Sequence, residues 1–260
     1  MKKLRVTLIQ TTLLWEDGNG NRMLMDELFK GIKKGSTDVV VLPEVFTSGF
    51  TMNAPKVAEH MHGKTLQWML ETAKRKNAVV CGSLVVCVGK NHFNRFVWVE
   101  PGGRVVHYDK RHLFRMAGED RVFTAGRKRV VIDYKGWRIC PQICYDLRFP
   151  VWSRNKNDYD VMLYIANWPE RRRHAWKSLL VARAIENQCY VVAVNRVGTD
   201  GKNLAYAGDS VVHDMWGESM TNIKPYKGSV VTVSLDLNAL LKARKDFPVD
   251  LDRDRFSLVS

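Results

Sequence analysis

A single cysteine stands at the end of a strand-like apolar stretch of this chain. The stretch covers residues 137–143, and Cys144 is followed by polar and charged residues and then by Pro150. A strand-to-helix corner of this kind holds a side chain at the rim of a sheet, where α/β enzymes commonly present a nucleophile. Free cysteines are also among the most buried residue types, so packing is the ordinary explanation for Cys144 taken alone.

Two further strand ends carry groups that would activate a thiol. Glu44 follows the apolar run 38–42, and partial burial raises the pKa of a carboxyl, which suits a general base near neutral pH. Lys110 follows a strand expected at 105–109, and a fixed ammonium stabilises an oxyanion and lowers the pKa of a nearby thiol. The plainer alternatives are a solvated loop glutamate and an exposed lysine. His112 is a candidate partner for the thiol, but its neighbours favour a satisfied structural histidine.

The elements that must position these residues alternate between strands and helices. Strands are expected at residues 5–11, 38–42, 78–88, 94–100, 105–109, 130–134, 137–143, 161–166, 190–197, 210–213 and 229–235. Helices are expected at residues 21–34, 65–76, 152–155, 174–187 and 237–245. Hairpins are expected between 94–100 and 105–109 and between 130–134 and 137–143, and a turn at 216–218 lies between the last two strands.

The interleaving of elements runs through the whole chain of 260 residues. No linker, low-complexity run or repeat interrupts it, so we expect one α/β domain over residues 1–260, with helices covering layered sheets. The tail, roughly residues 246–260, is charged and lacks a helical period. It is therefore expected either to be loose or to pack on a partner subunit.

The cysteine content and the lengths of the apolar runs indicate the cellular compartment of the protein. Its five cysteines are odd in number and include no C-x-x-C pair, which argues against a disulfide framework or a zinc site and for a reducing compartment. No apolar run approaches the roughly 18–20 residues that span a membrane. The basic stretch 1–10 fits a first strand better than a signal peptide. We therefore expect a cytoplasmic protein without a membrane partner.

The formal net charge of +14 raises the question of a nucleic-acid partner. The basic residues are scattered over expected helix faces and turns, and no nucleic-acid-binding motif accompanies them. We therefore expect a solvated basic surface that steers anionic substrates, and no nucleic-acid partner. Binding of DNA or RNA that weakens with salt would contradict this interpretation.

The three strand-end segments together resemble the nitrilase, or carbon–nitrogen hydrolase, superfamily, and the resemblance is closest to the bacterial ω-amidases. The superfamily has a Glu, Lys, Cys triad in that chain order, and its three motifs match residues 42–44, 108–114 and 144–150. Further matching segments are 166–169, 182–188, 194–198 and 208–210. Segments that look like those of the ω-amidases are 46–52, 116–119 and 167–169.

The resemblance implies a four-layer α-β-β-α sandwich, usually associated as a homodimer or a higher homo-oligomer. It implies that Cys144 is the nucleophile, Glu44 the base, and Lys110 an oxyanion donor beside the backbone N–H of Tyr145. Glu119 would orient Lys110 and help to place the substrate, the alternative being a surface charge on a helix or loop. The chemistry needs no metal and no organic cofactor, because the thiol is both a strong nucleophile and a good leaving group.

The substrate implied by the ω-amidases is a short dicarboxylic acid monoamide, such as 2-oxoglutaramate or 2-oxosuccinamate. Its amide would be cleaved to acid and ammonia through a thioester. The free carboxylate needs a cation, which arginine supplies best. The candidates are Arg148, Arg172 and Arg173. Arg148 is also placed to pair with Asp146. Candidate apolar walls are Phe114, Tyr145 and Trp168, and core packing is the alternative for Trp168.

Two other functions remain open at this point. The first is another reaction of the same superfamily, namely hydrolysis of an N-carbamoyl amide, an aliphatic amide or a nitrile. The second is a binding protein without catalysis. Retention of Glu44, Lys110 and Cys144 together argues against the second.

Overall fold

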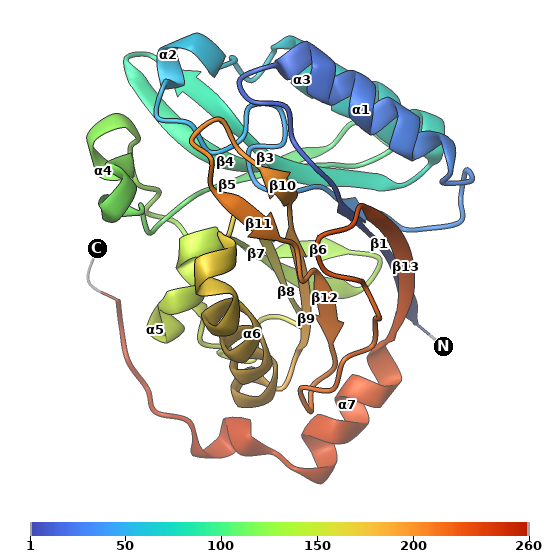
Figure 1. Ribbon diagram of the computed structural model, residues 1–260. Coiled ribbons are helices and arrows are strands. Elements are labelled where there is room, and N and C mark those ends of the chain that lie inside the picture. Colours follow the sequence, from blue (N-terminus) through green and yellow to red (C-terminus); the bar gives the residue numbers. More distant parts are fainter. Residues whose placement is uncertain (1, 259–260) are drawn as a thin grey trace.

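Two β-sheets face each other, and helices cover the outer face of each in this computed structural model, which describes residues 2–258 (Figure 1). The first sheet has the strand order β13 (Ser229–Asp236), β1 (Lys3–Gln10), β2 (Val39–Val41), β3 (Val79–Val88), β4 (Asn91–Val99) and β5 (Val105–Asp109). The second has the order β12 (Val211–His213), β9 (Tyr190–Asn195), β8 (Val161–Ala166), β7 (Trp137–Ile143) and β6 (Ile132–Tyr134). A separate hairpin joins β10 (Val197–Thr199) to β11 (Ala205–Ala207).

The helices complete the outer layers of the sandwich. On the first sheet lie α1 (Gly18–Lys30) and α3 (Lys64–Lys76), and on the second lie α5 (Pro150–Ser153) and α6 (Arg173–Asn187). The remaining helices are α2 (Ala54–Val57), α4 (Glu119–Val122) and α7 (Leu237–Asp246). Short 3₁₀ helices span Arg115–Ala117, Cys144–Arg148, Glu170–Arg172 and Val249–Asp252. This is the expected α-β-β-α arrangement.

Strand alternation distributes most of the apolar side chains among three large cores. In β8, Val161, Leu163 and Ile165 pack between the two sheets. Met162 and Tyr164 point to the other face and pack against α6. A third cluster fills the space between the first sheet and its helices. Because the central strands are buried on both faces, they read in the sequence as continuous apolar runs.

The centre of each sheet is parallel, which brings several strand ends to one edge. Strands β1, β2 and β3 run parallel in the first sheet. Strands β7, β8 and β9 run parallel in the second. Loops that leave the carboxyl ends of parallel strands are the usual place for a site in α/β proteins. Both sheets therefore contribute side chains to a shared edge.

An ion cluster ties the two sheets together at another edge. Asp38, which precedes β2, accepts hydrogen bonds from the Arg5 backbone N–H at 2.9 Å and from the Arg5 guanidinium at 3.1 Å. Lys135, in the turn between β6 and β7, donates to the same carboxylate at 2.6 Å. Burial raises the pKa of Asp38, but the two cations and the backbone donor outweigh it and lower this pKa to about 2.

Most expected elements are confirmed, and the differences concern strand pairing and short elements. The two expected hairpins are present as β4–β5 and β6–β7. The last two strands flank a turn but do not pair, because β12 joins the second sheet and β13 joins the first. The short helices α2 and α4 were not expected, since four residues are too few to set up a helical period.

The C-terminal tail lies against its own subunit over its described part. Gln188 donates to the carbonyl of Phe247 at 2.8 Å, and Lys156 donates to that of Phe256 at 3.3 Å. Figure 1 shows this segment running from α7 along the side of the molecule. Residues 259–260 lie outside the described part. Packing of the tail on a partner subunit stays a prediction.

None of the helices described between residues 2 and 258 has the length and apolar character needed to cross a membrane.

Candidate active site

Three strands place the candidate catalytic residues at one edge of the sandwich. Lys110 directly follows β5, Cys144 directly follows β7, and Glu44 lies three residues beyond β2. Cys144 has a φ of +45°, a conformation that non-glycine residues rarely adopt. Such strain persists where the surrounding structure enforces it, commonly at functional sites. The thiol is thereby presented at a sharp corner between β7 and the following 3₁₀ helix.

Glu44 is fully buried and is held at both carboxylate oxygens. Its Oε1 accepts hydrogen bonds from Asn94 Nδ2 at 2.8 Å and from Lys110 Nζ at 3.0 Å. Its Oε2 accepts from the backbone N–H of Asn167 at 2.7 Å. Because a carboxylate oxygen has two lone pairs, Oε2 keeps one for a further proton. The solvated-loop alternative for Glu44 is therefore wrong.

Lys110 is equally buried and lies between two carboxylates. Besides Glu44, its Nζ contacts Glu119 Oε1 at 2.9 Å and Oε2 at 3.0 Å. Glu119 begins α4 and also accepts from the backbone N–H of Phe114 at 2.5 Å. An ammonium has three N–H groups. If the two Glu119 oxygens share one of them, another remains free to point toward an oxyanion.

The electrostatics of this cluster set its protonation states. Burial lowers the pKa of Lys110, but Glu119 and Glu44 outweigh it, so this pKa lies above its usual range. Burial, with a further contribution from Glu44, raises the pKa of the Glu119 carboxyl, and Lys110 opposes the rise. Burial and the Glu44 carboxylate raise the pKa of the Cys144 thiol well above its ordinary value, and Lys110 does not offset them. The thiol of Cys144 is therefore neutral at rest.

His112 takes a structural position and does not pair with the thiol. Its Nδ1 lies 2.7 Å from Asp146 Oδ1, and its ring stacks on Phe149 with centroids 3.8 Å apart. The second oxygen of Asp146 accepts from Tyr108 Oη at 2.7 Å and from the Ile143 backbone N–H at 3.0 Å. These contacts hold the corner that carries Cys144. The interpretation of His112 as a satisfied structural histidine is confirmed.

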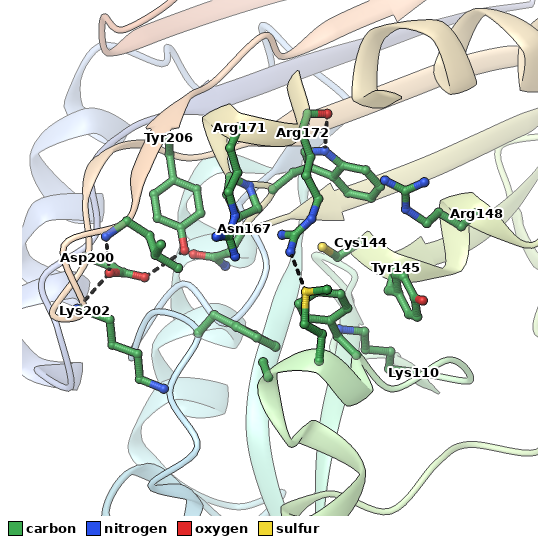
Figure 2. A pocket seen from close by; sticks show the side chains of 17 residues that line it. Lys110, Cys144, Tyr145, Arg148, Asn167, Arg171, Arg172, Asp200, Lys202 and Tyr206 are labelled. Atoms are coloured by element: carbon green, nitrogen blue, oxygen red, sulfur yellow. Dashed lines mark hydrogen bonds between the residues drawn. The ribbon is translucent and has the colours of Figure 1, made fainter. Parts of the chain in front are cut away.

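A cavity of about 230 Å³ opens above the thiol. It is lined by Phe50, Lys110, Phe114, Met116, Ala117, Cys144, Tyr145, Arg148, Asn167, Trp168, Pro169, Arg171, Arg172, Asp200, Lys202, Leu204 and Tyr206. Figure 2 shows Cys144 near the middle of this set, with Arg148 to one side and Asp200 and Lys202 to the other. Its size fits a molecule of a few carbon atoms, and its rim is strongly cationic.

The three arginines expected to bind the substrate do not all reach this cavity. Arg148 and Arg172 line it. Arg148 lies over the ring of Trp168, so its expected alternative pairing with Asp146 is wrong. Arg173 was also expected at the substrate, but it forms an ion pair with Asp209 and does not line the cavity. That expectation is wrong because successive residues at a helix start point in different directions.

The expected apolar walls are present. Phe114 and Tyr145 contact each other edge to face at 5.0 Å, and Arg172 lies over the Phe114 ring at 4.8 Å. Trp168 lines the cavity and is also part of the core beside α6. Tyr145 lies in the first turn of the 3₁₀ helix after β7, where backbone N–H groups lack partners within the helix.

Several residues of the site were missed from the sequence. Asn94 orients Glu44 from the middle of β4, and its signal was an asparagine inside a strand, where this residue is disfavoured. Asn167 follows β8 directly and holds Glu44 through its backbone, with its side chain donating to the Glu44 carbonyl at 2.6 Å. Arg171 reaches the cavity from the 3₁₀ helix Glu170–Arg172 and Lys202 from the turn after β10, and no short-range pattern connects either residue to Cys144.

Across residues 2–258, no group of three or more His, Cys, Asp or Glu side chains is arranged to hold a metal ion.

Comparison with known proteins places the chain in a family. A sequence model described as carbon-nitrogen hydrolase matches residues 5–245. The chain is 46% identical over 258 residues to the omega-amidase YafV of Escherichia coli (strain K12), which covers 99% of this chain and 100% of that protein. It is 33% identical over 237 residues to the 2-oxoglutaramate amidase of Bacillus subtilis (strain 168), with 88% and 91% covered.

A solved structure agrees with these sequence matches. XC1258 from Xanthomonas campestris, a CN-hydrolase superfamily protein with an arsenic adduct in its active site, superposes with a TM-score of 0.97. The two sequences are 46% identical, and the match covers the whole of both chains. This chain belongs to the carbon–nitrogen hydrolase family.

Proposed function

We propose that this carbon–nitrogen hydrolase removes the terminal amide of a short dicarboxylic acid monoamide, such as 2-oxoglutaramate or 2-oxosuccinamate, and releases ammonia. The observation that carries the proposal is a buried carboxylate and a buried ammonium beside a half-buried thiol at the floor of a small cavity whose rim is cationic. The names of the relatives, an omega-amidase and a 2-oxoglutaramate amidase, support the same substrate class.

In the first step Cys144 Sγ attacks the amide carbon while Glu44 takes the thiol proton. The C–S bond forms, and the carbonyl electrons move to an oxyanion that Lys110 and the Tyr145 backbone N–H stabilise. One such donor is typically worth roughly 3–4 kcal/mol of barrier. Glu44 then passes its proton to the amide nitrogen as the C–N bond breaks. Ammonia leaves, and a thioester remains on the sulfur.

In the second step water replaces ammonia. Glu44, ionised again, takes a proton from the water as its oxygen attacks the thioester carbon. The C–S bond breaks, and Glu44 returns the proton to the leaving sulfur. The neutral resting thiol supports this sequence, because a base is needed only at the moment of attack. An arsenic adduct in the active site of the Xanthomonas relative fits a soft sulfur ligand there.

The free carboxylate of the substrate would bind at the cationic rim. Arg148 and Arg172 flank the thiol, and neither forms an ion pair with another side chain among residues 2–258. Burial lowers the pKa of Arg172, and repulsion from Arg171 and Arg148 lowers it further. A bound carboxylate would relieve this repulsion, since guanidinium groups bind carboxylates through paired hydrogen bonds. A neutral amide would not.

The test is ammonia release from 2-oxoglutaramate combined with intact-protein mass spectrometry. Cys144→Ala is expected to abolish both ammonia release and the acyl adduct. Glu44→Gln is expected to form no adduct, because the amide side chain cannot take the thiol proton. Cys87→Ala, at a half-exposed thiol outside the cavity, serves as the matched control and should keep normal turnover. Wild-type ammonia release by Cys144→Ala would overturn the proposal.

We also propose that the protein works as a homodimer. Val151 on α5, Ile185 on α6 and Trp216 after β12 are 53%, 50% and 49% exposed. A side chain at Gly217 would meet Ile185, so Trp216 and Ile185 belong to neighbouring surface. Apolar surface of this kind favours association. Sedimentation should give twice the chain mass, and Ile185→Asp should shift it toward one chain. A wild-type protein that sediments as a monomer would contradict this.

A reducing compartment, the cytoplasm, is the proposed location. All five cysteines are free, and three of them are fully buried in the cores between the layers. Disulfides form mainly in oxidising compartments. Fractionation of cells with an antibody to the chain would test this, and recovery in a secreted fraction would contradict it.

A further inference from the structure

One wall of the cavity is formed by a single hairpin. Strands β10 and β11 pair antiparallel, with Gly198 opposite Tyr206 and Thr199 opposite Ala205. The turn between them carries Asp200, Lys202 and Leu204, which line the cavity together with Tyr206. In Figure 2 this wall lies on the side of the cavity away from Arg148. The hairpin belongs to neither sheet, so its position depends on side chains.

The acidic residue of this wall is used inside the hairpin. Asp200 Oδ1 accepts from the backbone N–H groups of Lys202 at 2.8 Å and Leu204 at 3.0 Å. Its Oδ2 accepts from Tyr206 Oη at 2.8 Å. The carboxylate therefore fixes the shape of the turn, and its donors come from the turn itself. The negative charge of Asp200 is therefore used within the hairpin and is not offered to a ligand in the cavity.

The basic residue of the same turn is unpaired. Lys202 is exposed and forms no ion pair with any residue from 2 to 258, although it lines the cavity. Its backbone N–H is fixed by Asp200, so the base of this side chain cannot drift from the cavity while the hairpin keeps its shape. An unpaired ammonium on a fixed turn is suited to bind an anionic group of a ligand.

A buried arginine holds the hairpin from below. Arg196, which directly follows β9, is fully buried, and its Nη2 donates to the carbonyls of Thr199 at 3.0 Å and Leu13 at 3.2 Å. Its Nε donates to the carbonyl of Val197 at 3.2 Å. The guanidinium lies 4.7 Å from the ring centre of Tyr206. Arg196 thus contacts both strands of the hairpin.

Burial of the Arg196 guanidinium is unfavourable for folding, which indicates that this side chain has a role in the structure of the hairpin. No carboxylate within residues 2–258 forms an ion pair with Arg196, and its Nη1 has no hydrogen-bond partner there. Burial lowers its pKa, in opposition to Tyr206 and Asp200. A buried charge without a direct counter-ion is unfavourable for folding. A planar group with donors in several directions is nevertheless the side chain that can join three carbonyls and an aromatic face.

We infer that the β10–β11 hairpin determines substrate charge specificity: Lys202 binds the free carboxylate of the monoamide, and Arg196 is the positioning residue that holds Lys202 at the cavity. This inference rests on the proposed function and assigns a further cation to the same site. Arg148 and Arg172 contact the substrate from the side of the thiol. Lys202 contacts it from the opposite wall, so that only an anionic end group satisfies both walls.

The first test compares two amides that differ only in the carboxylate, glutaramate and pentanamide. Lys202→Met is expected to raise KM for glutaramate about tenfold, the usual worth of one charge-assisted hydrogen bond. KM for pentanamide and kcat for both amides should not change. Lys74→Met removes the same charge from the exposed face of α3 and should leave all constants unchanged. An unchanged KM for glutaramate in Lys202→Met would overturn the inference.

The second test separates positioning from stability. Tyr206→Phe removes only the hydroxyl that holds Asp200 and keeps the ring under Arg196. It is expected to raise KM for glutaramate two- to fivefold without changing kcat for either amide or the melting temperature by more than a few degrees. Arg196→Met should also raise KM for glutaramate without changing kcat for either amide, and the rise in KM should be larger. A parallel fall of kcat for both amides, with KM unchanged, would mean a merely structural role and would contradict the inference.

Failure of the proposed substrate class and failure of the Lys202 assignment give different kinetic results. If wild-type protein hydrolyses glutaramate and pentanamide equally well, the proposed substrate class is wrong. If wild-type protein prefers glutaramate and Lys202→Met retains the whole preference, the substrate class stands and the assignment of Lys202 is wrong.

Discussion

At the scale of single residues, the defining feature is that the proposed nucleophile, the Cys144 thiol, is neutral at rest. Many cysteine enzymes lower the thiol pKa with a neighbouring cation. Here Lys110 is that cation, but Glu44 and Glu119 neutralise it, and burial keeps the Cys144 proton in place. Activation therefore has to come from a base that removes the proton during attack. Glu44 is the carboxylate placed for that role.

The first prediction concerns alkylation of Cys144 in the absence of substrate. Because thiolates and not thiols react with iodoacetamide, modification should be slow at pH 7 and should accelerate as pH rises beyond 9. Peptide mass spectrometry after timed labelling measures the rate. Cys87, which is half-exposed, serves as an internal reference in the same protein. A Cys144 rate that is already maximal at pH 7 would contradict the assignment of a neutral thiol.

The second prediction concerns Glu119, which contacts Lys110 through both oxygens. Glu119→Gln keeps the shape of the side chain but weakens its hold on the ammonium. Misplacement of a catalytic group by about 1 Å costs roughly 100-fold, so kcat should fall by about that factor with little change in KM. Asp120→Asn, at the exposed neighbouring position on α4, is the matched control. Equal kcat and KM values for the two variants would contradict the role of Glu119 in positioning Lys110.

At the scale of elements, the two sheets are joined at an edge by Asp38, between Arg5 of β1 and Lys135 of the β6–β7 turn. The pKa of Asp38 in the folded protein is about 2, below its ordinary value of 3.8. The folded state therefore binds this proton less readily than the unfolded state. The resulting stabilisation is complete above about pH 4 and disappears as pH falls to 2.

The third prediction follows from the pH range over which Asp38 loses its stabilising charge. Asp38→Asn should have a lower free energy of unfolding than wild type at pH 6, because two cations lose their partner. The difference should shrink between pH 4 and pH 2. Denaturant titration at several pH values measures it, with Asp26→Asn, at an exposed ion pair on α1, as the control. A difference that stays constant down to pH 2 would show that the carboxylate charge is not the cause.

Which elements could be predicted from the sequence depended on how local their signals were. Buried parallel strands such as β8 read as continuous apolar runs, and Glu44 and Cys144 follow strands with parallel neighbours, β2 and β7, whereas Lys110 follows the antiparallel edge strand β5. The pairing of β12 and β13 with different sheets has no local signal. Neither does the hairpin that brings Lys202 to the thiol of Cys144, which is distant in the chain. Contacts of this kind depend on the closed fold.

At the scale of the whole molecule, many ionisable groups are buried in their neutral forms. Burial raises the pKa of the thiols of Cys81, Cys140 and Cys189 and of the hydroxyls of Tyr159 and Tyr164. The folded protein therefore retains these protons at a pH where the unfolded chain releases them. These groups therefore leave the free energy of unfolding unchanged below their pKa values in the unfolded chain, about 9 to 10. They lower the free energy of unfolding at higher pH.

The fourth prediction is a loss of stability in alkali. The free energy of unfolding should fall steadily as pH rises from 9 to 11, while the pH range from 7 to 8.5 should show little change from these groups. Urea denaturation followed by tryptophan fluorescence is a suitable measurement. A free energy that is constant up to pH 11 would mean that these side chains reach solvent in the folded state.

The protonated state of the Cys144 thiol has one more consequence, which concerns oxidation. Peroxides attack thiolates and convert them to sulfenic acid and then to irreversible higher oxides. A nucleophile that keeps its proton until an amide is bound offers such oxidants little to attack. The arrangement of Glu44, Lys110 and Glu119 therefore protects the resting enzyme against oxidative damage, and the thiol becomes vulnerable chiefly during turnover.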